Sequence, residues 1–151
     1  MQWIIGADHA GFKAKEDLKK FIQTELKDDV VDVGTSDDQR CNYPDFALKV
    51  CQKLLAAQAS SVVRGILICG TGIGMSMAAN RFAGIRAALC QHPQEAQLAR
   101  EHNDANVLCL GARILTLEQM QAIILAFKQG EFAQGRHSER VAIFDSLGQK
   151  I

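Results

Sequence analysis

The chain has 151 residues, of which 48% are hydrophobic and 23% charged, and 17 Lys and Arg balance 17 Asp and Glu to a formal net charge of +0. This length and composition predict one globular domain over residues 1–151, while the lack of basic excess argues against a nucleic-acid or membrane-surface partner. No apolar run approaches the roughly 20 residues that cross a bilayer, and the first residues show neither a basic leader nor a cleavage site. We therefore expect a cytoplasmic protein with no membrane partner.

Short apolar runs alternate with helical patterns along the whole chain. Five runs rich in Val, Ile and Leu have the length of strands: 3–5, 30–34, 66–69, 85–89 and 107–111. Apolar residues recur at helical spacing in the segments between and after them: 12–26, 44–55, 76–82, 93–102 and 117–127. This alternation predicts a three-layer, Rossmann-like α/β sandwich with a five-stranded parallel sheet.

Two arginines and a histidine stand close together near the end of the chain. A turn-rich stretch at 130–135 precedes an expected last helix at about 136–148. Arg136 and Arg140 are four residues apart and share a face of that helix. Such a pair suits a phosphate or carboxylate ligand, a solvated basic face being the alternative. A terminal helix outside a finished α/β unit often packs on a neighbouring subunit, and we expect that here.

Five cysteines form no CxxC pair and are odd in number: Cys41, Cys51, Cys69, Cys90 and Cys109. Their spacing fits neither a zinc ribbon nor a disulfide framework, so we expect free thiols and no metal. Most of them should be small buried hydrophobes. Cys69 differs because a glycine-rich loop follows it.

That loop has the sequence Cys69-Gly70-Thr71-Gly72-Ile73-Gly74, between an apolar strand and a helix. Glycines at alternate positions let successive backbone N–H groups turn inward and form an anion cradle at a helix N-terminus. A thiol at the head of such a cradle can act as a base or a nucleophile once it is deprotonated. A buried Cys that merely closes a strand is the alternative.

The loop differs from three common glycine-rich loops. A Walker loop ends in Gly-Lys-Ser/Thr, whereas this loop continues with Gly74-Met75-Ser76. A dinucleotide fingerprint follows the first strand and has an acidic residue about 20 positions later, whereas residues 90–92 contain none. A cysteine phosphatase loop needs an arginine near its end, where Met75 and Ser76 stand.

Other polar residues stand where predicted elements end. Asp8 and His9 follow the first strand and Arg113 follows the fifth, while His102 lies where a helix should end. Asp8 could equally cap a helix beside a solvated His9, and His102 could be a helix cap. Together with Cys69, these groups provide a thiolate base, an oxyanion cradle, imidazoles for proton transfer and arginines for phosphate. Proton transfer next to the carbonyl of a phosphorylated small molecule needs those groups and no cofactor.

Nine short blocks, in a fixed order over nearly the whole chain, point to a family: 6–12, 32–35, 43–45, 65–74, 78–80, 84–87, 102–108, 111–113 and 135–137. They resemble the type B ribose-5-phosphate isomerases, a family that also contains the galactose-6-phosphate isomerase subunits. The resemblance implies an aldose–ketose isomerase that interconverts D-ribose 5-phosphate and D-ribulose 5-phosphate through an enediolate.

The resemblance also implies residue roles. Cys69 is the base that moves a proton between carbons 1 and 2, and Thr71 with the loop backbone stabilises the enediolate. His102 is the acid that opens the furanose ring, assisted by Asp8. Phosphate contacts are implied for His9, Arg136 and Arg140. The full set of matching substrate positions is Asp8, His9, Gly70, Thr71, Gly72, Ile73, Gly74, Asn103, Arg113, Arg136 and Arg140.

One branch of the family uses a glutamate as the base, at the position of Met75. The chain therefore resembles the cysteine branch, and it carries Cys69 and His102 together. The resemblance implies a homodimer or a dimer of dimers without cofactor, with active sites drawn from both chains. Two alternatives remain: an isomerase of a six-carbon phosphosugar (allose or galactose 6-phosphate), set by pocket depth near Tyr43 and His9, or a non-catalytic sugar-phosphate-binding module.

Overall fold

The computed structural model describes residues 1–57, 62–144 and 146–151. The strands of its sheet are β1 (Gln2–Ala7), β2 (Asp29–Asp32), β3 (Val63–Cys69), β4 (Ala87–Leu89) and β5 (Val107–Gly111). The helices described are α1 (Phe12–Thr24), α2 (Tyr43–Ala57), α3 (Ile73–Ala79), α4 (Pro93–Asn103), α5 (Leu117–Gln129), the 3-10 turn η1 (Gly135–His137) and α6 (Ser138–Phe144). No helix in these ranges is both long and apolar enough to cross a bilayer.

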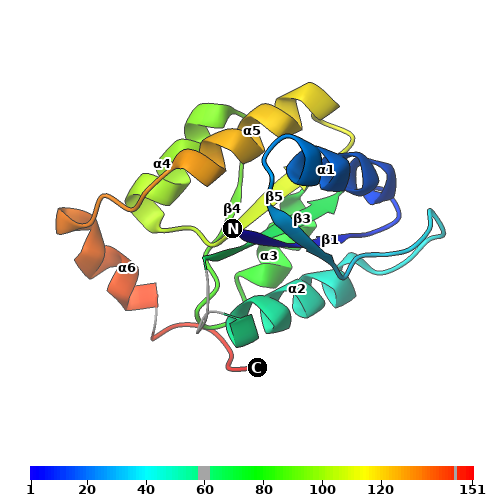
Figure 1. Ribbon diagram of the computed structural model, residues 1–151. Coiled ribbons are helices and arrows are strands. Elements are labelled where there is room, and N and C mark those ends of the chain that lie inside the picture. Colours follow the sequence, from blue (N-terminus) through cyan, green and yellow to red (C-terminus); the bar gives the residue numbers. More distant parts are fainter. Residues whose placement is uncertain (58–61, 145) are drawn as a thin grey trace.

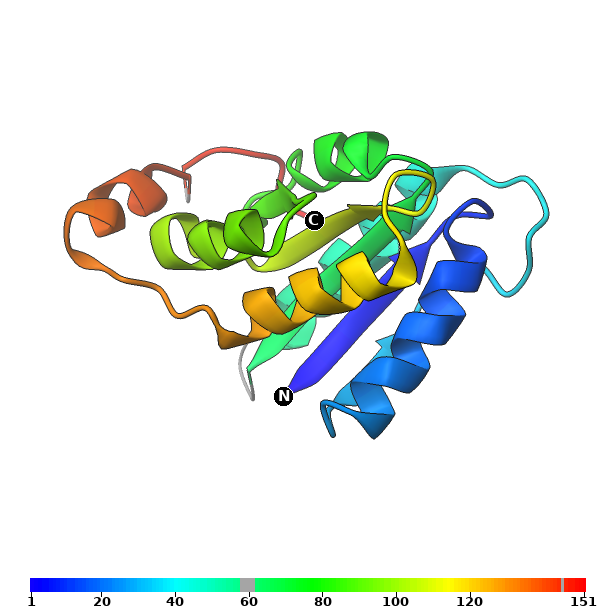
Figure 2. The same cartoon turned by 90° about the horizontal axis from the view of Figure 1, so that it is seen from above.

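The strands form one parallel sheet, as expected, and their order in it is β2-β1-β3-β5-β4. Helices α1, α4 and α5 cover one face and α2 and α3 cover the other (Figure 1). The predicted three-layer α/β sandwich is confirmed. Helix α6 lies outside the three layers, beside α4 (Figure 2).

Strand β3 shows why the apolar runs become central strands. Its side chains alternate between the two faces, so that Ile66 and Ile68 pack under α1 and α5, whereas Leu67 and Cys69 pack against α2 and α3. A strand buried on both faces is a nearly continuous apolar run, and in β3 the exception is the buried Arg64. The same alternation places Cys69 at the end of β3, on the face that α3 covers.

The expected helix at 136–148 was wrong in its bounds. Residues 135–137 form a 3-10 turn and α6 covers Ser138–Phe144, so Arg136 and Arg140 do not share one continuous α-helix. The change of structure begins at Gln134 and Gly135, which both have a φ of 57°. Beyond α6 the chain turns back, and the N–H of Gln149 donates to the carbonyl of Arg81 at 2.8 Å.

Two other bounds differ from expectation near the glycine loop and the end of β2. Helix α3 begins at Ile73, three residues earlier than expected, because the loop itself turns directly into the helix. Strand β2 ends at Asp32 rather than Gly34, because the Asp32 carboxylate bends back to accept the N–H of Gly34 at 2.9 Å.

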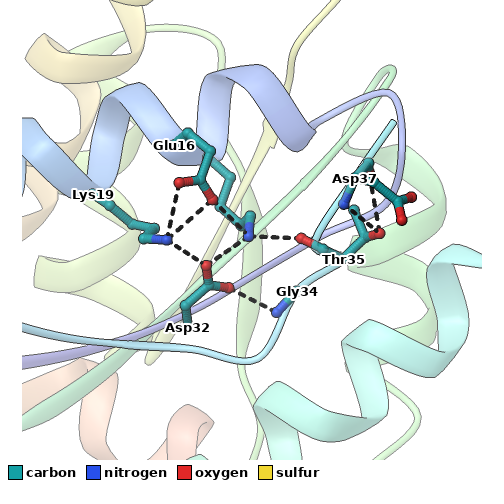
Figure 3. Close-up of polar contacts among 7 residues, drawn as sticks. Glu16, Lys19, Asp32, Gly34, Thr35 and Asp37 are labelled. Atoms are coloured by element: carbon teal, nitrogen blue, oxygen red, sulfur yellow. Dashed lines mark hydrogen bonds and ion pairs between the residues drawn. The ribbon is translucent and has the colours of Figure 1, made fainter. Parts of the chain in front are cut away.

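A buried lysine joins α1 to the end of β2. Lys15 is 1% exposed, and its Nζ donates to Asp32 Oδ2 at 2.6 Å and to the carbonyl of Thr35 at 2.8 Å. Lys19 also pairs with Asp32 Oδ2, at 2.7 Å, and Glu16 lies beside both lysines (Figure 3). Burial opposes ionisation of Asp32, yet the bonds from the two lysines hold the pKa of that carboxyl below its usual range. The network therefore fixes the start of the loop that follows β2.

We expect Lys15→Met to lower the free energy of unfolding by about 3 kcal/mol, since it removes one partner from a buried ion pair. Methionine keeps most of the apolar stem, so the loss reports the ammonium group. Lys20→Met is the matched control on the same helix, because that side chain is 77% exposed. Urea titrations of the three proteins measure the effect, and equal losses in both variants would contradict it.

The lowered pKa of Asp32 predicts a pH dependence of stability. Its ionised form contributes stability above the pH at which the unfolded carboxyl titrates, about 3.9, and this contribution is lost as pH falls through the lower folded pKa. Asp32→Asn should thus be less stable than the parent at pH 7, and the gap should shrink below about pH 4. A gap that stays constant from pH 7 to pH 3 would contradict this assignment.

Candidate active site

The carboxyl ends of four strands meet at one edge of the sheet. The N–H of Asp8 donates to the carbonyl of Ile68 at 3.2 Å, and that of Thr35 donates to the carbonyl of Ala7 at 3.0 Å. Cys69 is the register partner of Gly111 at the end of β5. Ligands of open parallel sheets bind beyond this edge. Of the predicted site residues, this edge carries Asp8, His9, Arg113 and the loop at 69–74.

Cys69 lies at the head of the loop and is 5% exposed. Its Sγ accepts the N–H of Gly72 at 3.2 Å, a contact that stabilises negative charge on the sulfur. Gly72 has a φ of 77°, and a Cβ there would lie 2.6 Å from Leu89 Cδ1. The position therefore requires glycine both for its left-handed conformation and for space. The close approach of β5 requires a second glycine, because a Cβ at Gly111 would lie 2.7 Å from the carbonyl of Thr71.

The outer part of the loop offers hydrogen-bond donors. The hydroxyl oxygen of Thr71, an exposed residue, accepts the N–H of Ile73 at 3.3 Å. The N–H groups of Gly70 and Thr71 donate to no other group in the described ranges. Backbone donors fixed in this way suit an oxyanion that develops beside Cys69.

Two side chains form walls against this loop. The side chain of Arg113 lies over Gly70, since a Cβ built on that glycine would be 3.4 Å from Arg113 NH1. The ring of Tyr43 lies against Gly74, where a Cβ would be 2.6 Å from Tyr43 Cζ. Tyr43 is 39% exposed and opens α2. From the sequence, Tyr43 was noted only as a residue that sets the depth of the pocket, because a Tyr before Pro at a helix start does not indicate a specific chemical role.

One oxygen of the Asp8 carboxylate holds the turn that precedes α1, whose N-cap is Gly11. Asp8 Oδ1 accepts the N–H groups of Ala10 at 3.0 Å and Gly11 at 3.1 Å, and the residue is 5% exposed. His9 Nδ1 accepts the N–H of Cys41 at 3.3 Å. A neutral ring that accepts at Nδ1 carries its proton on Nε2, which can donate to a ligand. The hydrogen bond from the loop after β2 thereby leaves Nε2 as the nitrogen of His9 that can donate.

Three of the other cysteines are core residues, as expected. Burial raises the pKa of Cys51 to about 12 and that of Cys90 to about 12. Burial also raises the pKa of Cys109 well above its usual value. These thiols stay protonated at neutral pH, and none has a glycine loop beside it. All five cysteines are free, and Cys41 is half-buried.

His102 and Asn103 lie at the other edge of the sheet. They end α4, which runs back from β4 to the start of β5, whereas Cys69 pairs with the last residue of β5. At about 3.3 Å per residue, the four steps from Val107 to Gly111 alone separate the two places by about 13 Å. Within one chain, the structure therefore does not bring His102 to Cys69.

The basic residues of the chain's end gather around His102 instead. Its ring stacks on that of His137, with ring centroids 4.4 Å apart and an interplanar angle of 8°. Arg136 and Arg140 flank His137, and both are exposed. The predicted site thus falls into two groups of residues, which we call the thiol half (Asp8, His9, Cys69–Gly74 and Arg113) and the imidazole half (His102, Asn103, Arg136 and Arg140).

Ion pairs fix the C-terminal end of α4. Asp104, the C-cap, has left-handed φ and ψ of 46° and 41°. Its carboxylate pairs with Arg86 NH2 at 2.8 Å and with Arg100 NH1 at 2.7 Å. Paired guanidiniums of this kind hold a carboxylate in one geometry. The cap is therefore Asp104, which leaves the side chains of His102 and Asn103 available. No three His, Cys, Asp or Glu side chains of the described residues gather to hold a metal ion.

The chain is similar to known proteins over nearly its whole length. A family model described as Ribose/Galactose Isomerase matches residues 3–144. Ribose-5-phosphate isomerase B of Escherichia coli is 43% identical over 146 residues, 97% of this chain and 95% of that protein. The solved ribose-5-phosphate isomerase B of Clostridium thermocellum has a TM-score of 0.91 at 40% identity, covering 97% of this chain and 96% of its own.

A further solved relative carries a ligand. Ribose-5-phosphate isomerase B of Mycoplasma genitalium, with bound ribulose-5-phosphate, has a TM-score of 0.89 at 38% identity, covering 96% of this chain and 94% of its own. Sequence, fold and the order of the motifs lead to the same conclusion. The chain belongs to the ribose/galactose isomerase family.

Proposed function

We propose that this protein is an aldose–ketose isomerase that interconverts D-ribose 5-phosphate and D-ribulose 5-phosphate through an enediolate. The observation that carries the proposal is Cys69, which ends a buried strand with its sulfur bonded to the N–H of Gly72 and backbone donors beside it. Relatives named ribose-5-phosphate isomerase B support it, as does the relative that binds ribulose-5-phosphate.

The first step opens the furanose ring. His102 donates a proton to the ring oxygen, while Asp8 accepts the proton of the hydroxyl on carbon 1. The bond between carbon 1 and the ring oxygen breaks and leaves an aldehyde. Asp8 is suited to this role because its Oδ1 is already engaged by Ala10 and Gly11, which fixes the direction of the other oxygen.

The second step is the isomerisation. The Cys69 thiolate takes the proton from carbon 2, the electron pair forms a double bond between carbons 1 and 2, and negative charge develops on the oxygen of carbon 1. The N–H groups of Gly70 and Thr71 stabilise that charge. The thiol then returns its proton to carbon 1, and the hydroxyl proton on carbon 2 moves to the neighbouring oxygen, which leaves the ketone.

Binding divides between the two halves. His9 donates from Nε2 to the phosphate, Arg136 and Arg140 supply its counter-charge, and Asn103 and Arg113 contact the sugar. Because the imidazole half lies at the far edge of the sheet in one chain, a second copy must provide it. We infer a homodimer, alone or paired into a dimer of dimers, in which each site joins the thiol half of one chain to the imidazole half of the other.

A six-carbon phosphosugar is the second candidate substrate, because the matching family model covers galactose as well as ribose isomerases. The two substrate classes need the same catalytic groups. They differ in the space required between Tyr43, which packs on Gly74, and His9.

We expect the protein to convert ribose 5-phosphate to ribulose 5-phosphate in the presence of a chelator, and faster than it converts allose 6-phosphate or galactose 6-phosphate. A ketose assay on the three substrates in parallel measures this. A preference for a hexose phosphate would change the assigned substrate but not the proposed mechanism. No turnover of any of them would favour a sugar-phosphate-binding module.

The shared site predicts complementation between two inactive variants. Cys69→Ala should lower kcat by at least about 10³-fold by removing the base, and His102→Gln should lower it by about 10²-fold or more by removing the acid. Mixed by co-expression, half of the dimers are hybrids with one intact site of two. The mixture should therefore recover about a quarter of parental activity.

Cys90→Ala is the control for the first variant, because it removes a buried thiol that has no role in the proposed steps. It should retain kcat. A mixture no more active than its two components would contradict the shared site, and a Cys69→Ala protein with near-parental kcat would contradict the base.

A further inference from the structure

His137 contacts the proposed acid, although none of the roles above uses it. Its ring is parallel to that of His102 within 8°, with centroids 4.4 Å apart, and both rings are half-buried. The two residues come from different elements, η1 and α4. A stack of this kind fixes a ring plane, because tilting either ring loses contact over the whole face.

The backbone brings His137 to this place. The N–H of Ala133 donates to the carbonyl of Glu101 at 2.9 Å, which ties the chain to α4 one residue before His102. The turn at 134–137 then closes with the N–H of His137 donating to the carbonyl of Gln134 at 3.1 Å. The ring stack and the backbone hydrogen bonds therefore both hold His137 at the end of α4.

The surroundings of His137 disfavour a proton on its ring. Desolvation lowers its pKa, and the charges of His102 from α4, Arg136 from its own turn and Arg140 from α6 lower it further. Arg136 Nε lies 3.5 Å from His137 Nε2, a distance at the outer limit for a hydrogen bond to an unprotonated ring nitrogen. An imidazole that resists protonation supplies little charge to a phosphate, but its face can still lie against another ring.

We propose that His137 is a positioning residue: its ring lies flat on His102 and aims the acid at the ring oxygen of the sugar. The inference rests on the proposed role of His102. It gives the C-terminal segment two separate roles: Arg136 and Arg140 contact the phosphate, and His137 orients the proton donor. An aromatic ring of similar size should replace His137, because the role depends on a flat face rather than on a titrating group.

Two variants separate these possibilities. His137→Ala removes the face, and we expect kcat to fall about tenfold with KM within about twofold, since a misaimed donor slows the chemical step. His137→Phe keeps the face, and kcat and KM should stay within about twofold of the parent, with an unchanged pH profile above pH 7. His92→Ala is the control, because that histidine caps the opposite end of α4.

A KM that rises similarly in His137→Ala and His137→Phe would mean that the imidazole binds substrate, and would overturn the proposal. So would an unchanged kcat in His137→Ala, or a failure of Phe to rescue it. Circular dichroism of both variants identifies a loss of fold, and in that event the Phe variant and the NMR measurement below decide.

A second readout needs no turnover. The chain has four histidines, so the ring protons of His102 can be followed by NMR in histidine-labelled protein. Loss of the neighbouring ring current should shift them in His137→Ala and much less in His137→Phe. Unshifted signals in both variants would overturn the stack. If the parent protein isomerises nothing, the proposed function fails while this measurement still decides whether His137 orients His102.

Discussion

The site depends on how closely two backbone segments approach at the carboxyl edge of the sheet. The loop after β3 lies directly against the end of β5, so closely that a Cβ at Gly111 would lie 2.7 Å from the carbonyl of Thr71. That contact fixes the loop from below, and the left-handed turn at Gly72 aims its N–H at Cys69. A larger residue at either glycine would push the donors away from the sulfur. The same two glycines are therefore required both for the close packing of the loop and for the position of its donors.

Much of this was predictable from the sequence. The continuous apolar run at 66–69 predicts a strand buried on both faces, which the structure contains, and the glycines after it predict a turn into a helix, which begins at Ile73. The turn-rich stretch at 130–135 was predicted, but its continuation as a 3-10 turn to His137 was not, because residues 136–140 fit a helix equally well. Tyr43 was marked only for pocket depth, since its contact with Gly74 depends on the packing of α2 against α3.

The separation of Cys69 from His102 needs the topology as well as the motifs. From residue types alone, a thiol, imidazoles and arginines were assigned to one site. Residue types carry no information on which edge of the sheet each side chain occupies. A helix that connects two parallel strands runs antiparallel to them, so His102 at the end of α4 must lie near the start of β5. That the sites are drawn from two chains stays an expectation from the family resemblance, and residue chemistry alone could not supply it.

The two halves also differ in how they carry charge. Around Cys69, the stabilising groups are mostly backbone dipoles, which favour a developing oxyanion without holding a permanent counter-ion next to the base. Arg113 is the exception, and it lies over Gly70 while remaining exposed. A thiolate paired tightly with a cation would be a weaker base, so most of the full positive charge is better placed on the other half.

The arginines of the imidazole half also act on His137. Desolvation and the charge of His102 lower the pKa of His137, and Arg136 and Arg140 lower it further. A bound phosphate carries about two negative charges and offsets the charge of the two arginines. With substrate bound, the charge of these two side chains is therefore directed to the phosphate, while the stack of His137 on His102 remains a contact between ring faces.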